Sequence, residues 1–242
     1  MTKSTIAGTL MAMVLVTGVS QAQAQGTGSD GRIFASIEFG AQPQQRTTET
    51  STTFPLYDET ATIATSQPVH NGPVFGASGG YLVRPTIGVA VGLTIFNARS
   101  SDSAVVATIP DLFFFNRPKV VTATATGLKH REVGVHFQAV WFHPVSEKLE
   151  VVLAAGPSLI SVKHDLATAS VATGTQTVTT ATSSESKSGI GFNAGFEGNY
   201  RLAPRYLAGL FVRYAGGTVD LPSVPDLKVG GLQAGLGLRL RF

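Results

Sequence analysis

The sequence contains no cysteine among its 242 residues, and it carries little charge. The lack of cysteine excludes disulfides and thiolate metal sites. Charged residues make up 14% of the chain, well below the roughly 25% of ordinary soluble domains. The net charge is only +3 and no dense Lys/Arg tract is present, so nucleic acid is not expected as a partner. The 27 glycines, together with abundant Thr, Ser and Ala, suit strands and turns better than helices.

Long apolar runs are also scarce, and the clearest one lies near the amino-terminus. Lys3 precedes the apolar stretch Ile6–Val19, and a small-x-small triplet, Ala22 to Ala24, follows it. The stretch is shorter than the roughly 20 residues of a membrane-spanning helix. The pattern therefore predicts a secretory signal peptide over residues 1–24, followed by a short segment over 25–31.

The rest of the chain alternates apolar residues with small or polar ones. In the segment 33–40, for example, Ile33, Ile37 and Phe39 alternate with Glu38 and Gly40. Since strand side chains point to opposite faces with a period of two, each such segment predicts a two-faced strand. Eight segments follow this pattern, at residues 33–40, 75–83, 87–95, 132–141, 149–159, 190–202, 206–214 and 232–242.

The connections between these segments alternate in length. Three short turns contain Pro85, Pro144 and Pro204, whereas the connections 41–72 and 98–128 are long and 165–188 is rich in Thr, Ser and Ala. Short turns at one end and long loops at the other are typical of transmembrane barrels. Residues 32–242 are thus predicted to form an all-β, eight-stranded antiparallel up-and-down transmembrane barrel, with short periplasmic turns and long extracellular loops.

The polar face of these strands is sparse and suits the lumen of a small barrel. Since buried charges need partners, we expect its glutamates to pair with its arginines and to fill the lumen. A narrow channel for ions or small solutes is the alternative. The predicted lumen charge network consists of Glu38, Glu132, Glu197, Arg213 and Arg239.

The other face is almost wholly apolar, as a lipid-facing surface requires. A soluble lipocalin-like binder would instead carry a crowded charged face. Aromatic residues on the apolar face lie beside the short turns, which predicts an interfacial belt. The belt residues are Tyr81, Trp141, Tyr200, Tyr206 and Phe242.

With a signal peptide, four hairpins and a last strand ending in phenylalanine, residues 32–242 resemble the OmpA- and OmpX-like small outer-membrane barrels of Gram-negative bacteria. The resemblance implies contact with outer-membrane lipid and lipopolysaccharide. It also implies recognition by the outer-membrane assembly machinery, with Leu236, Leu238, Leu240 and Phe242 as the signal. No peptidoglycan-binding domain follows the predicted barrel, so the anchoring role of OmpA-type proteins is not carried over.

We find no constellation that indicates an enzyme, a metal site or a cofactor. His130 and His136 share the inward face but are too far apart to bind one metal, and Asp165 beside His164 is only a weak catalytic candidate. Phe113–Phe115 would fold over the barrel mouth, enter the outer leaflet or contact a partner. The Thr-rich stretch near residue 180 is expected to extend two strands above the membrane. The sequence therefore predicts a structural or surface-interacting protein, with an outer-membrane enzyme as a less favoured alternative.

Overall fold

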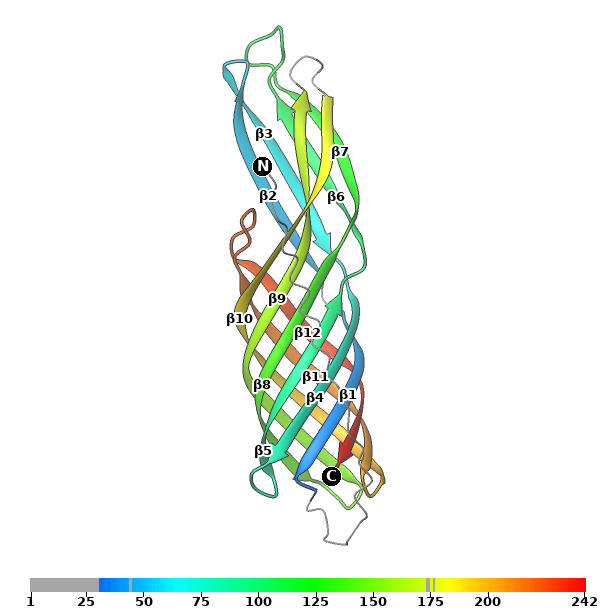
Figure 1. The fold of residues 1–242 in the computed structure, drawn as a ribbon. Coiled ribbons are helices and arrows are strands. Elements are labelled where there is room, and N and C mark those ends of the chain that lie inside the picture. Colours follow the sequence, from blue (N-terminus) through cyan, green and yellow to red (C-terminus); the bar gives the residue numbers. More distant parts are fainter. Residues whose placement is uncertain (1–30, 44, 173–174, 176) are drawn as a thin grey trace, which may run out of the picture.

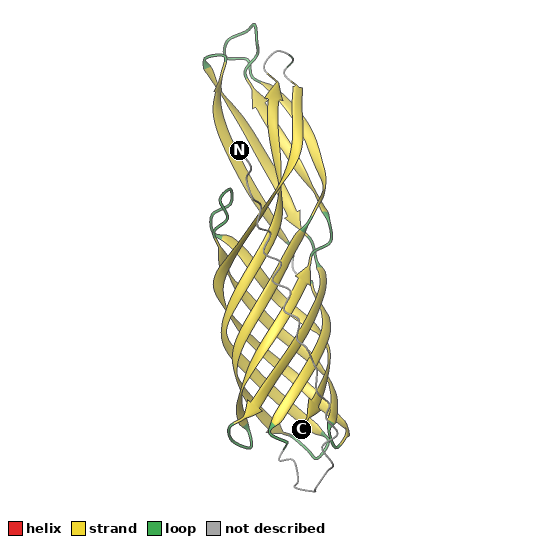
Figure 2. Cartoon of the chain, viewed as in Figure 1, coloured by secondary structure: helices red, strands yellow, loops and turns green. Residues whose placement is uncertain are grey.

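The computed structural model describes residues 31–43, 45–172, 175 and 177–242 (Figure 1). The predicted signal peptide lies outside the described residues. Within the described part of the chain, no helix is long and apolar enough to cross a membrane. Strands run along the full length of the molecule, and the short loops join them at its ends and near its middle (Figure 2).

Eight strands form a closed antiparallel barrel, which confirms the predicted fold class. Its ring order is β1-β12-β11-β10-β9-β8-β5-β4. The first and last strands close the ring, with Ile37 opposite Leu238 and Ala41 opposite Ala234. The barrel strands are β1 (Ile33–Gln42), β4 (Gly72–Leu82), β5 (Ile87–Asn97), β8 (His130–Pro144), β9 (Leu149–Ala172), β10 (Thr177–Ala203), β11 (Tyr206–Val219) and β12 (Leu227–Arg241).

The segments 41–72 and 98–128 are not the long loops that we expected. They form two hairpins that make a second sheet, in the order β2-β3-β6-β7. β2 is mostly a run of Thr and Ser, and β3, β6 and β7 mix Thr and Ser with Ala and a few larger apolar residues, so these strands lack the regular face of large apolar side chains that marks a strand in lipid. Thr nevertheless favours strands, because its branched side chain fits a pleated surface. The additional strands are β2 (Arg46–Leu56), β3 (Glu59–Val69), β6 (Ser101–Ile109) and β7 (Lys119–Leu128).

The Thr-rich stretch extends β9 and β10 beyond the barrel, as expected. The pairing of these two strands continues from Leu149 opposite Tyr200 to Ala172 opposite Thr177. Their upper parts lie beside the second sheet (Figure 1). We call this assembly, β2, β3, β6, β7 and residues 165–172 and 177–186, the distal module.

The distal module has an apolar core of its own. Completely buried residues come from β6, while β9 contributes Ala167. Burial of these side chains stabilises the module as a folded extension of the barrel. The buried core residues are Leu56, Ala61, Ile63, Val105, Ala107, Ile109, Ala125, Leu128 and Ala167.

Candidate functional site

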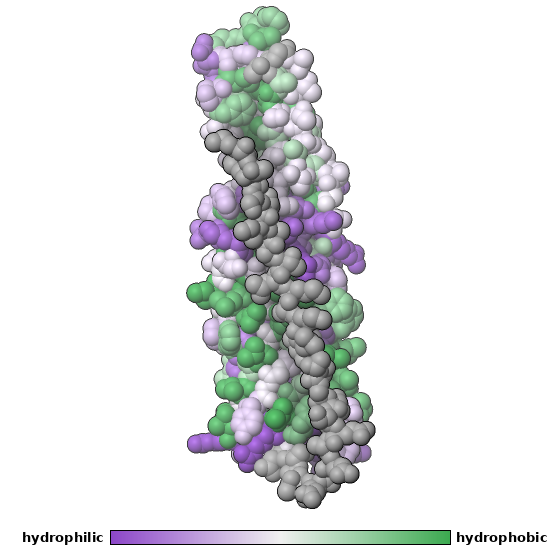
Figure 3. Space-filling model, viewed as in Figure 1, coloured by the Kyte–Doolittle hydropathy of each residue, from purple (hydrophilic) through white to green (hydrophobic). Residues whose placement is uncertain are grey.

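The outer surface of the barrel is apolar over most of its height. Ile37, Phe192 and Leu236 are 61%, 56% and 63% exposed. Figure 3 shows the lower half of the molecule as predominantly hydrophobic, with hydrophilic residues gathered at mid-height. An exposed apolar surface of this extent suits lipid rather than water. We call it the apolar band; its uppermost outward residues are Phe39, Phe75, Ile95, Val133, Leu159, Ile190, Tyr214 and Leu232.

The five aromatic residues predicted to form a belt all lie on this outer surface, close to the short turns. Tyr81 lies opposite Ile33, and Tyr206 lies opposite Leu240 near the end of the chain. Phe242 donates its backbone N–H to the Ile33 carbonyl at 2.8 Å. Each of the five residues is 43–49% exposed. Their placement at the membrane–water interface stays a prediction.

Four of the five predicted lumen charges form two ion pairs inside the barrel. Arg213 Nη2 lies 3.0 Å from Glu38 Oε2, and Arg239 Nη2 lies 2.5 Å from Glu197 Oε2. Arg239 also donates to the Ser36 hydroxyl at 2.9 Å. In each pair the partners stand on strands separated by one strand of the ring, β12 between Arg213 and Glu38 and β11 between Arg239 and Glu197, so each pair links side chains on the inner wall of the barrel.

Glu132 is not part of this group. Its carboxylate lies 2.6 Å from Arg46 and 2.7 Å from His130, and it accepts the Gly230 N–H at 2.8 Å. Gly230 adopts a φ of +82°, where an added Cβ would lie 1.8 Å from the Ala215 carbonyl. The Arg46 contact was missed because this residue stands in a segment that we expected to be a loop.

Sequence reasoning also missed a fourth arginine–glutamate ion pair and an apolar cluster that fills the lumen near the short turns. Arg241 Nη2 lies 2.5 Å from Glu150 Oε2, and the guanidinium stacks 4.8 Å from the ring of Phe142. The strict two-residue period of β8, β9 and β12 puts Phe142, Glu150 and Arg241 on the inward face, but it does not show which of them meet. The buried apolar cluster at this end consists of Phe34, Leu82, Ala90, Val140, Phe142, Val152 and Ala154.

Three of the five histidines, His130, His136 and His164, are buried and make hydrogen bonds within the barrel, whereas His143 is exposed. His136 bonds to the hydroxyls of Thr94 and Ser158, both at 2.8 Å. His130 Nδ1 lies 2.9 Å from His164 Nδ1. Among the described residues, no group of His, Asp and Glu is arranged to hold a metal ion.

His164 lies above the apolar band, five residues beyond Leu159 on β9. Burial, reinforced by the charges of His130 and Arg46, lowers the pKa of His164 from 6.5 to about 4. The ring is therefore neutral near pH 7, which lets it share a hydrogen bond with His130 at the top of the lumen.

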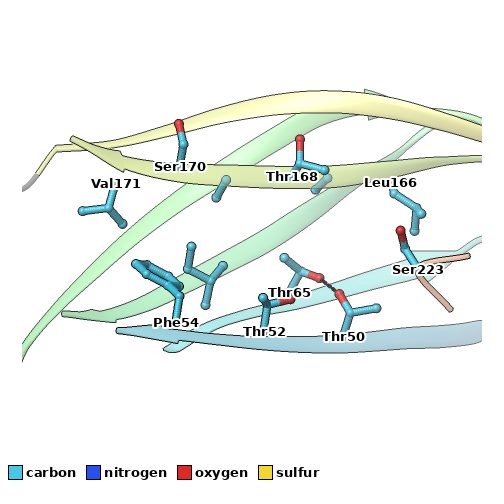
Figure 4. Close-up of a pocket in the computed structure, with 12 residues that line it drawn as sticks. Thr50, Thr52, Phe54, Thr65, Leu166, Thr168, Ser170, Val171 and Ser223 are labelled. Atoms are coloured by element: carbon cyan, nitrogen blue, oxygen red, sulfur yellow. Dashed lines mark hydrogen bonds between the residues drawn. The ribbon is translucent and has the colours of Figure 1, made fainter. Parts of the chain in front are cut away.

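The distal module contains a groove of about 430 Å³ between β2, β3 and β9 (Figure 4). Threonine hydroxyls and apolar side chains alternate along it, and Thr50 is hydrogen-bonded to Thr65. The groove carries no charged group, so it suits a neutral ligand better than an ionic one. Its lining includes Thr50, Thr52, Phe54, Ile63, Thr65, Leu166, Thr168, Ser170 and Val171.

Phe113–Phe115 form an exposed tip between β6 and β7, at the end of the molecule farthest from the barrel (Figure 1). Their exposures are 82%, 58% and 70%. Asp111 accepts the backbone N–H groups of Phe113 and Phe114, and Arg117 stacks 5.5 Å from the Phe114 ring. The tip therefore neither folds over the barrel mouth nor reaches the apolar band, which leaves contact with a partner as the remaining expectation.

Comparison with known proteins finds similarity to solved structures only. No protein-family model matches the sequence, and the search of curated proteins gives no match. Neisserial surface protein A is 16% identical, with a TM-score of 0.44 over 88% of this chain and 97% of that chain. The N-terminal β-barrel domain of Pseudomonas aeruginosa OprF is 12% identical, with a TM-score of 0.41 over 87% and 98%. The Escherichia coli outer-membrane protease OmpT is 8% identical, with a TM-score of 0.38 over 91% and 99%.

Proposed function

We propose that the protein is an integral outer-membrane barrel of a Gram-negative bacterium that presents its distal module to a partner outside the cell. The observation that carries the proposal is the division of the molecule into an apolar band and a distal module with a polar exterior and its own core. The band is suited to outer-membrane lipid and lipopolysaccharide. The closing strand, with Leu236, Leu238, Leu240 and Phe242, is our candidate signal for the assembly machinery.

The partner contact is assigned to the tip and the groove of the distal module. Three neighbouring exposed phenylalanines have no role in the core of the module, and apolar surface of this kind commonly marks interaction sites. The rigid strands beneath the tip hold it at a fixed distance from the membrane. We infer a structural or binding role rather than catalysis, since the three histidines of the lumen, His130, His136 and His164, are buried and held in hydrogen bonds.

Cysteine labelling tests the orientation directly, because the natural chain has no cysteine. Asn116→Cys lies beside the exposed tip, and Ser146→Cys lies in the turn between β8 and β9. On intact cells, a membrane-impermeant maleimide should label the first variant and should label the second only after the outer membrane is permeabilised. Fractionation and a heat-modifiability gel complete the test. A soluble periplasmic protein, or labelling in the reverse order, would overturn the proposal.

A narrow channel is the second candidate, and the ion pairs inside the lumen argue against it. Arg213–Glu38 and Arg239–Glu197 occupy the interior that solutes would have to cross. Eight strands leave an interior just wide enough to be filled by side chains.

A further inference from the structure

Two cations face each other on the outer surface of the barrel. Arg131 of β8 lies directly opposite Lys163 of β9, and both side chains are exposed. Directly opposed residues of neighbouring strands have Cβ atoms about 5 Å apart, where like charges destabilise the sheet. The arrangement therefore costs stability unless an anion lies between the two side chains.

No carboxylate in the described part of the chain supplies that anion. Among the described residues, neither Arg131 nor Lys163 takes part in an ion pair within 4.0 Å. Asp165 is a nearby carboxylate, two residues along β9 on the same face. Its oxygens already accept the Lys129 N–H at 3.1 Å and the Ser184 hydroxyl.

The position of the pair indicates what kind of anion would bind. Arg131 stands one outward step above Val133, at the upper edge of the apolar band, and Asn97 lies opposite it on β5. A ligand here would have its charge beside the two cations and its apolar part against Val133 and Ile95 below. Arginine can bind a phosphate through two parallel hydrogen bonds, and lysine adds a point charge.

We propose that Arg131 and Lys163 bind the phosphate of a phosphorylated lipid in the outer leaflet of the membrane. The inference rests on the proposed function, because the outer-membrane location places this edge of the band at the headgroup level. The lipid phosphate relieves the repulsion between the two cations, and its acyl chains cover the apolar residues beneath them.

The test compares the full chain with the double variant Arg131→Gln, Lys163→Gln in uncharged detergent micelles. Arg117→Gln, Lys119→Gln serves as the control, since it removes the same charge from the distal tip. Retention of bis-phosphorylated lipid A, measured by native mass spectrometry, should fall at least about tenfold in the first variant, because two charge-assisted contacts are lost. The control should retain the lipid like the parent, and a dephosphorylated analogue should bind both poorly.

The midpoint of thermal unfolding, measured with and without lipid A, separates lipid binding by the two cations from a purely structural role of these residues. Without lipid A, the Arg131/Lys163 variant should unfold at the same temperature as the parent or a higher one, because the repulsion is gone. With lipid A, only the parent and the control should gain stability. Equal lipid A retention by parent and variant, or a variant less stable than the parent without lipid, would overturn the inference.

Two further outcomes are informative. Displacement of lipid A by inorganic phosphate at equal concentration would assign the pair to free phosphate and refute the lipid site. Cell fractionation tests the proposed function separately. A variant that still reaches the outer membrane but binds lipid A like the parent refutes only the phosphate site.

Discussion

Replacing Arg213 tests whether the lumen ion pairs stabilise the barrel. Its guanidinium lies 3.0 Å from Glu38, and the two side chains are only 9% and 6% exposed. Arg213→Met keeps an unbranched apolar stem near the ring of Phe211, over which the guanidinium stacks at 5.3 Å. The variant loses the charge that faces Glu38, together with one hydrogen bond from Arg213 Nε to Gln233 Oε1 at 3.2 Å.

The expected cost follows from the burial of the carboxylate that is left behind. Removing one partner of a buried ion pair lowers the free energy of unfolding by about 3–5 kcal/mol. Because both side chains keep some exposure to solvent, we expect the cost here to be about 3 kcal/mol. Glu38→Gln should cost a similar amount, because it leaves Arg213 unpaired. The double variant buries neither charge, so its cost should fall clearly below the sum of the single costs.

Urea unfolding in lipid vesicles measures these free energies, and Trp141 reports on them as the one tryptophan in the chain. Arg117→Met, which changes an exposed arginine at the tip, should shift the free energy by less than about 0.5 kcal/mol. Single variants that unfold like the parent, or single costs that simply add in the double variant, would refute the reasoning.

Other predictions concern assembly, pH and conductance. Phe242 is 49% exposed, so deleting it should cost only a few kcal/mol at most and leave folding in micelles intact. The deleted form should be poorly inserted in cells, and normal insertion would refute the assembly signal. Folding lowers the pKa of His164 from 6.5 to about 4. As the pH falls, His164 therefore takes up a proton in the unfolded chain before it does so in the folded protein, and the folded protein loses stability between these two pKa values. The parent should therefore lose more stability than His164→Gln between about pH 7 and pH 5, and equal losses would contradict this assignment. Planar-bilayer recording of the parent should show no stable single-channel conductance; a reproducible conductance would favour the narrow channel.

The sequence by itself determined the faces of the barrel strands. A strand projects alternate side chains to opposite sides, so local periodicity was enough to place Ile37 outside and Arg213 inside. The same periodicity marked the apolar band, because lipid requires a continuous apolar face on every spanning strand. The number and order of the barrel strands followed from that signal and from the alternation of short and long connections.

Only the tertiary structure decided which charged side chains pair and that the long connections form a second sheet. Glu132 contacts Arg46, 86 residues away, because closure of the ring and the path of β2 bring them together; no local pattern encodes that distance. The strands of the distal module were not predicted, because they pack around a small core and have no lipid-facing apolar side. A sequence rich in Thr and Ser does not distinguish such a strand from a loop. Period two is a property of one strand, whereas partners and cores depend on how strands are placed against each other.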